Sequence, residues 1–64
     1  MEIRVNNPYF DEVYVTNELT MSRWMNFLEN HKRGNEDIIY FTDKHTGKVI
    51  SINPKNFASV EVSE

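Results

Sequence analysis

Several residue types are scarce in this chain of 64 residues, which has no cysteine, two glycines and two prolines. Without cysteine the chain forms no disulfide and no thiolate metal site, which fits a reducing cytosol. No apolar run approaches the roughly 20 residues that cross a bilayer. The start, MEIRVNNPYF, has neither the basic nor the apolar region of a signal peptide. We therefore expect a cytoplasmic protein that makes no membrane contact.

Basic residues are outnumbered, with seven Lys and Arg against ten Asp and Glu, so the net charge is −3. The acidic excess lies in residues 1–30, whereas residues 31–64 are balanced. A dedicated nucleic-acid-binding domain usually carries a clear basic excess on one face. The charge balance therefore does not indicate such a domain.

Residues that could carry chemistry are few. His31 and His45 are the only imidazoles, and a metal site would have to draw its other ligands from scattered carboxylates. The serines fall within predicted helix or strands, and none lies on a nucleophile elbow. The HTGK segment lacks the first glycine of a phosphate-binding loop. We predict a protein that is not an enzyme and that uses no cofactor and no metal.

The aromatic content, by contrast, is sufficient for a packed core, with one Trp, three Tyr and four Phe. The length allows one domain, spanning residues 1–64. A domain this small is marginally stable alone, so good packing or association with a partner must supply stability.

The central segment has the spacing of an amphipathic helix. Met21, Trp24, Met25 and Leu28 follow one another at i, i+3, i+4 and i+7. We expect Thr16 or Asn17 to cap the N-terminus, with Glu18 in the first turn. Gly34 is the expected end, because glycine enters the left-handed conformation without a Cβ clash.

Strands are predicted on both sides of this helix, at residues 2–5 and 12–15 before it and within 37–42, 48–52 and 57–62 after it. Asp43 and Gly47 frame a hairpin loop, and NPKN at 53–56 forms a turn. We expect the last three strands to form a meander that the helix covers. The predicted fold class is α+β, with one amphipathic helix on a small, mostly antiparallel sheet of three to five strands in the order β-β-α-β-β-β.

One helix cannot cover every aromatic side chain in the chain, and exposed aromatic and arginine residues are typical of protein interfaces. The NPYF segment places two aromatic residues directly after a turn, where they serve either as an anchor for a partner or as core. The predicted partner-binding residues are Tyr9, Phe10, Glu12, Tyr14 and Arg23. A homodimer could also form through an unpaired edge strand, either EIRV or EVSE.

A second hypothesis is a small dimeric regulator that binds nucleic acid through basic turns. It requires the hairpin tip and the helix end to lie together, so that their charges meet phosphates. Its candidate residues are Lys32, Arg33, Lys44, His45, Lys48 and Lys55. Acidic residues alternate with these, which favours a solvated hairpin tip over a phosphate site.

The C-terminal segment GKVISINPKNFASVEV resembles small proteins encoded by phages and mobile elements of Gram-positive bacteria, over about residues 46–62. It is also similar to the small flagellar FlbD-type hairpin proteins. The phage resemblance implies an accessory protein that binds and blocks or redirects a host enzyme, often one that handles nucleic acid or defends against phage. We therefore predict a non-enzymatic protein-binding module that modulates or inhibits a larger protein.

Overall fold

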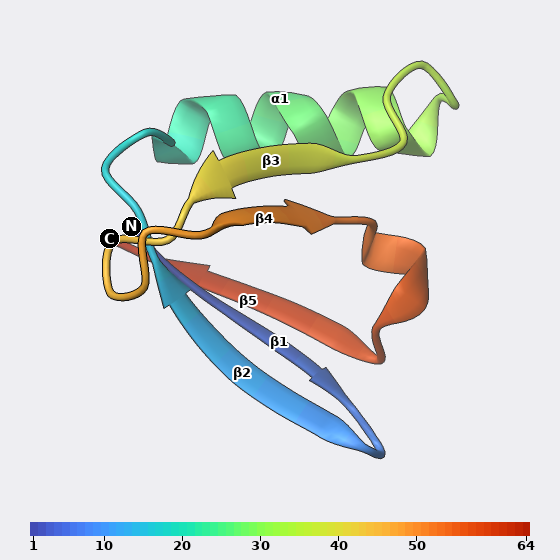
Figure 1. Ribbon diagram of the computed structural model, residues 1–64. Helices are drawn as coiled ribbons and strands as arrows, with labels where there is room; N and C mark the ends of the chain where they lie inside the picture. Colours follow the sequence, from blue (N-terminus) through green and yellow to red (C-terminus); the bar gives the residue numbers. More distant parts are fainter.

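The computed structural model describes all 64 residues. Its elements are β1 (Glu2–Asn7), β2 (Phe10–Val15), α1 (Met21–Lys32), β3 (Ile39–Thr42), β4 (Val49–Ile52), a 3-10 turn η1 (Pro54–Asn56) and β5 (Ser59–Ser63). The α+β class and the order β-β-α-β-β-β are as predicted. Figure 1 shows α1 on one side of the molecule and the strands below it.

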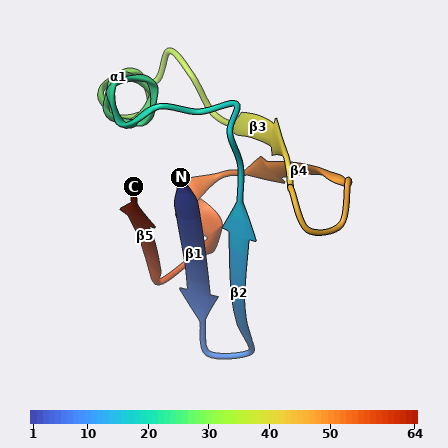
Figure 2. The ribbon, with the colours of Figure 1, turned by 90° about the vertical axis from the view of Figure 1, so that its left-hand side faces the viewer.

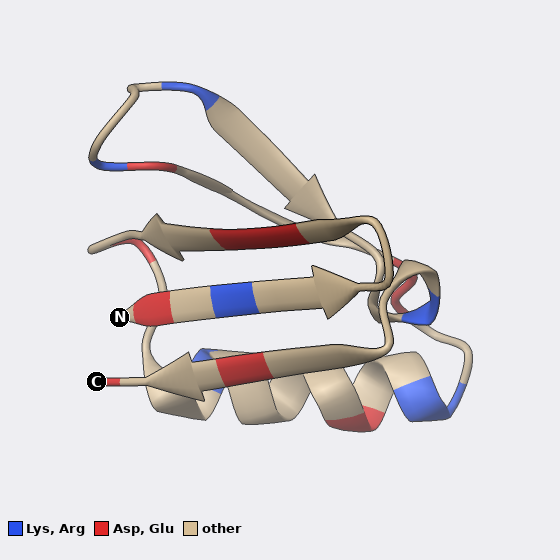
Figure 3. Cartoon of the chain, turned by 90° about the horizontal axis from the view of Figure 1, so that it is seen from below, with Lys and Arg blue, Asp and Glu red and all other residues tan.

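The strands form two antiparallel sheets. Sheet A has the order β2-β1-β5, and sheet B is the β3–β4 hairpin. The strands of sheet A lie side by side in Figure 2, where α1 is seen end-on and sheet B runs across. Helix α1 and sheet B together cover the inner face of sheet A, and its outer face is left uncovered (Figure 3).

The expected C-terminal meander is wrong in one pairing. Strand β5 pairs with β1, joining Ile3 to Val62 and Val5 to Val60, and does not pair with β4. The turn at Pro54 carries the chain from one sheet to the other, and the Asn53 side chain caps it by accepting the N–H of Lys55. Because the EIRV segment is therefore the central strand of sheet A, it cannot be the free edge that we expected there.

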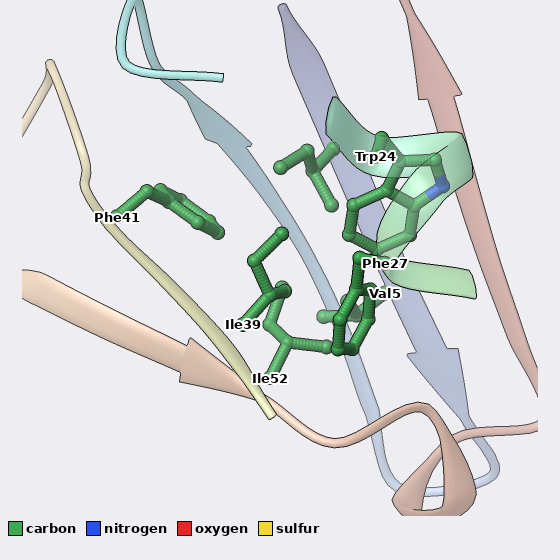
Figure 4. Packing of buried hydrophobic residues seen from close by; sticks show 7 residues of the cluster. Val5, Trp24, Phe27, Ile39, Phe41 and Ile52 are labelled. Carbon is green, nitrogen blue, oxygen red and sulfur yellow. The ribbon is translucent and has the colours of Figure 1, made fainter. Parts of the chain in front are cut away.

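The core lies where the three layers meet (Figure 4). Sheet A contributes Ile3 and Val5 to the core, and α1 contributes Trp24 and Phe27. The remaining side chains come from sheet B. The buried hydrophobic residues are Ile3, Val5, Trp24, Phe27, Ile39, Phe41 and Ile52. In each strand they alternate with exposed residues, as a half-buried strand requires.

The helix is rotated relative to the predicted stripe. Phe27 is fully buried and its ring centroid lies 5.5 Å from that of Trp24, whereas Met25 is 55% exposed. The start also differs, because Thr20 is the N-cap and its Oγ1 accepts the N–H of Arg23. The predicted end is correct, since Gly34 has a φ of 79° and follows the C-cap.

Candidate functional site

A groove runs along the free edge of sheet A, between β2 and the hairpin loop of sheet B. We call it the β2 groove; it encloses about 410 Å³ and is open to solvent. Strand β2 and the loop form its two walls, and Ile50 of β4 also lines it. Its lining residues are Phe10, Glu12, Val13, Tyr14, Asp43, His45, Thr46, Lys48 and Ile50.

The carboxylate of Asp43 holds the two walls together. It accepts the main-chain N–H of Val15 at 3.1 Å and the Thr46 hydroxyl at 2.8 Å, and it is only 3% exposed. The main-chain N–H of Lys44 donates to the carbonyl of Val15 at 2.7 Å. The hydrogen bonds that the Asp43 carboxylate accepts hold its pKa below the usual value, and the bond from Val15 contributes most. A charged hydrogen-bond acceptor therefore holds the hairpin loop against β2.

Two aromatic rings form the apolar part of the β2 wall. Tyr14 packs edge-on against the buried Phe41 with ring centroids 6.0 Å apart, and burial raises the pKa of its hydroxyl. Phe10 lies 6.3 Å from the ring of Phe57 and remains partly exposed. Each ring thus has one side against the protein and one side toward the groove.

The structure brings together three of the five predicted partner-binding residues, because Phe10, Glu12 and Tyr14 all line the β2 groove. Tyr9 lies at the tip of the β1–β2 turn and is 97% exposed, so its ring is not part of the core. Arg23 lies elsewhere on α1, where its guanidinium forms a bidentate ion pair with the Glu36 carboxylate.

The six basic residues of the nucleic-acid hypothesis lie at two ends of the molecule. Lys44, His45 and Lys48 belong to the loop after β3, whereas Lys32 and Arg33 end the helix that leads into the start of β3. Lys55 is in η1, which follows β4 and lies at the same end as the helix terminus (Figure 1). The helix end and the hairpin tip are thus separated by the length of β3, and the condition for a single basic patch is not met.

The outer face of sheet B is an exposed surface that sequence reasoning missed. Tyr40 and Val49 are each 70% exposed and are diagonal neighbours across the hairpin, with Thr42 and Ser51 beside them. None of these four residues is charged. The signal was present in the alternation of IYFT, because a strand that buries Ile39 and Phe41 must expose Tyr40.

The outer face of sheet A is polar in comparison. Arg4 lies at its centre, opposite Val13 and Glu61, and makes two hydrogen bonds to the Asp11 carboxylate at 3.0 and 2.7 Å. This pairing lowers the pKa of Asp11 and raises that of Arg4. Figure 3 looks onto this face, where acidic segments of all three strands surround one basic segment.

The side-chain contacts do not include the hydrogen-bonded pair that activates a hydroxyl nucleophile. None of the side-chain hydrogen bonds joins a Ser, Thr or Tyr hydroxyl to a histidine, and His31 instead contacts the carbonyl of Glu36. No group of three or more His, Asp and Glu side chains is placed to hold a metal ion.

No helix of the structure is both long and apolar enough to cross a bilayer.

Comparison with known proteins adds no family to this geometry. No family model, no curated protein and no solved structure matches the chain. The function must therefore be argued from the surfaces themselves.

Proposed function

We propose that the protein is a non-enzymatic binding module that docks onto a larger protein through the β2 groove and thereby modulates or inhibits it. The observation that carries the proposal is the position of Phe10, Glu12 and Tyr14, which line one groove beside the free edge of a sheet. Apolar rings with a charged rim are typical of protein-binding surfaces.

The fully exposed Tyr9 extends this surface beyond the groove. A tyrosine held at a turn presents a large contact area with little conformational entropy to lose on binding. The Asn7 side chain fixes the turn, because its Oδ1 accepts the N–H of Tyr9 at 2.9 Å. We expect Tyr9 to contact the partner first and the groove to provide most of the buried area.

The proposal places the protein in the cytoplasm, which the lack of cysteine supports. We further propose that the protein is an accessory factor of a phage or mobile element and acts on host nucleic-acid or defence machinery. Only the resemblance of residues 46–62 supports that origin.

Affinity capture from a nuclease-treated bacterial lysate tests the proposal. We expect one protein to be retained near stoichiometry by the wild type and by a Tyr40→Ala variant, which alters the other exposed face. The double variant Tyr9→Ala/Phe10→Ala should lose it while still melting cooperatively. Retention of the same protein by all three variants would contradict the proposal, as would recovery of nucleic acid alone when nuclease is omitted.

A further inference from the structure

The free edge of β2 is a short row of unpaired main-chain groups. Thr16 exchanges two hydrogen bonds with Met1, whereas the N–H and C=O of Val15 point away from β1 toward Asp43 and Lys44. Because main-chain groups alternate sides along a strand, those of Val13 and Asp11 also point away from β1. No element of the chain covers them, since β2 is the outermost strand of sheet A.

The β2 groove lies beside this edge, so an added strand would have room for its side chains. Residues of such a strand that face the inner side of sheet A would lie against Phe10, Glu12 and Tyr14. The hairpin loop already occupies the edge at Val15 and thus ends the available stretch. The site accepts about five residues, opposite positions 10 to 14.

A second copy of the chain is a poor occupant of this edge. Two antiparallel β2 strands that avoid the blocked Val15 place either Glu12 opposite Glu12 or Asp11 opposite Asp11. Like charges directly opposite one another destabilise a strand pair. A register that pairs Val13 with Val13 avoids both like-charge contacts. It places Asp11 of one copy opposite Val15 of the other, whose main-chain groups already bond to Asp43 and Lys44.

The charge on β2 itself favours a basic residue opposite position 12, while Lys48 and His45 line the facing wall. Glu12 is exposed at the centre of the site and forms no ion pair, whereas Asp11 is already paired with Arg4. On either side of Glu12 along the same face lie the rings of Phe10 and Tyr14. Opposite charges and aromatic–β-branched pairs directly across neighbouring strands each stabilise the strand pair.

Taking the proposed function as its basis, we infer that β2 binds an extended segment of the partner protein as a fourth, antiparallel strand of sheet A. The segment has a Lys or Arg between two apolar residues, in the pattern apolar–x–basic–x–apolar. The basic residue lies opposite Glu12 and the apolar residues lie opposite Phe10 and Tyr14. The x positions lie opposite Asp11 and Val13, and their main-chain groups form the hydrogen bonds.

Amide chemical-shift titrations with capped peptides test this inference on the intact protein. A peptide with the core Val-Thr-Lys-Thr-Val should shift the amides of Asp11 and Val13 and bind about fivefold more tightly than its Val-Thr-Glu-Thr-Val counterpart. Glu12→Lys should reverse this preference. N-methylation of the two threonines should weaken binding by about tenfold, because it removes donors to the edge, whereas N-methylation of the lysine should have little effect.

Two protein variants provide the matched pair. Val13→Pro removes the edge donor and should weaken binding of the lysine peptide, whereas Val13→Ala should not. Because N-methylation is made on the peptide, it gives a result even if Val13→Pro fails to fold.

Four outcomes would overturn the inference: equal affinity for the lysine and glutamate peptides, equal effects of the two N-methylations, no binding of any peptide at millimolar concentration, or concentration-dependent shifts at Asp11 and Val13 in the free protein. The last outcome would identify a second copy as the occupant. A lysate partner that is lost with Tyr9→Ala/Phe10→Ala but kept by Val13→Pro would leave the proposed function standing and remove strand addition.

Discussion

At the residue scale, Asp43 connects the two sheets. Its carboxylate accepts hydrogen bonds from Val15 and Thr46, which lie on opposite sides of the groove. A neutral side chain would accept these donors less strongly, because hydrogen bonds to a charged group are the stronger kind. The shape of the groove therefore depends on one ionised side chain.

This dependence gives a stability that changes with pH. The pKa of Asp43 is lower in the folded protein than in the unfolded chain, where it is about 3.9. Its contribution is therefore present above the unfolded pKa and is lost as the pH falls through the folded pKa. We expect Asp43→Asn to lower the urea midpoint at pH 7, and the difference from the wild type to shrink below about pH 4.

Urea denaturation at a series of pH values measures this effect. Asp37→Asn serves as the control, since Asp37 is exposed and accepts no hydrogen bond. An Asp43→Asn variant whose midpoint equals that of the wild type at pH 7 would show that the carboxylate does not stabilise the fold.

At the element scale, the rotation of α1 decides which side chains stabilise the protein. Phe27→Ala should cost about 3–5 kcal/mol, because it removes a fully buried ring from the centre of the core. Met25→Ala should change the stability by less than about 0.5 kcal/mol, because Met25 is more than half exposed. Chemical denaturation of the two variants measures the free energy of unfolding. Equal decreases for both variants would show that Met25 packs in the core, as the sequence pattern predicted.

The β3–β4 hairpin gives a second element-scale prediction. Gly47 has a φ of 72°, and a Cβ there would meet nothing within 4 Å, so only backbone strain opposes substitution. Gly47→Ala should destabilise the protein by about 1 kcal/mol, and Gly47→Asn by less, because asparagine tolerates this conformation better. Thermal unfolding compares the two, and an unchanged melting temperature for Gly47→Ala would refute the prediction.

Features that depend on neighbouring residues were predictable from the sequence, whereas contacts between distant residues were not. The hairpin at Asp43–Gly47 and the helix end at Gly34 were predictable, because each depends on a few neighbouring residues. The pairing of β5 with β1 was not, since alternation in SVEV shows which face is buried but not which strand lies beside it. The rotation of α1 was missed because the stripe could be drawn through Met25 or through Phe27.

The candidate site was predictable in the same limited way. Phe10, Glu12 and Tyr14 were identified from the aromatic and charged composition of β2, but the opposite wall of the groove is formed by the loop that begins at Asp43, far along the chain. The hydrogen bonds that join Asp43 and Lys44 to Val15 hold that loop against β2. No local pattern in the sequence predicts a contact between these two distant segments.

At the scale of the whole molecule, the six basic residues of the nucleic-acid hypothesis are divided between two ends, each with acidic residues near it. The affinity for DNA or RNA, and its dependence on salt, both increase with the number of phosphates that the protein neutralises together. Charges that lie at two separate ends therefore give a low affinity with a small salt dependence. We expect no mobility shift with mixed DNA and RNA at low salt. A shift that disappears at physiological salt and is reduced by Lys44→Glu or Lys48→Glu would instead favour the nucleic-acid hypothesis.

The central position of β1 has a consequence for the order in which the protein folds. One neighbour of β1 follows it across a tight turn, while the other is the last strand of the chain and pairs Glu2 with Ser63. Closing a loop of that length costs entropy before any contact rewards it, so such pairings form slowly. We therefore expect the β1–β2 hairpin to form early. Ile3 and Val5 would remain in contact with water on the side of β1 that β5 covers, and the pairing of β5 would complete sheet A late in folding.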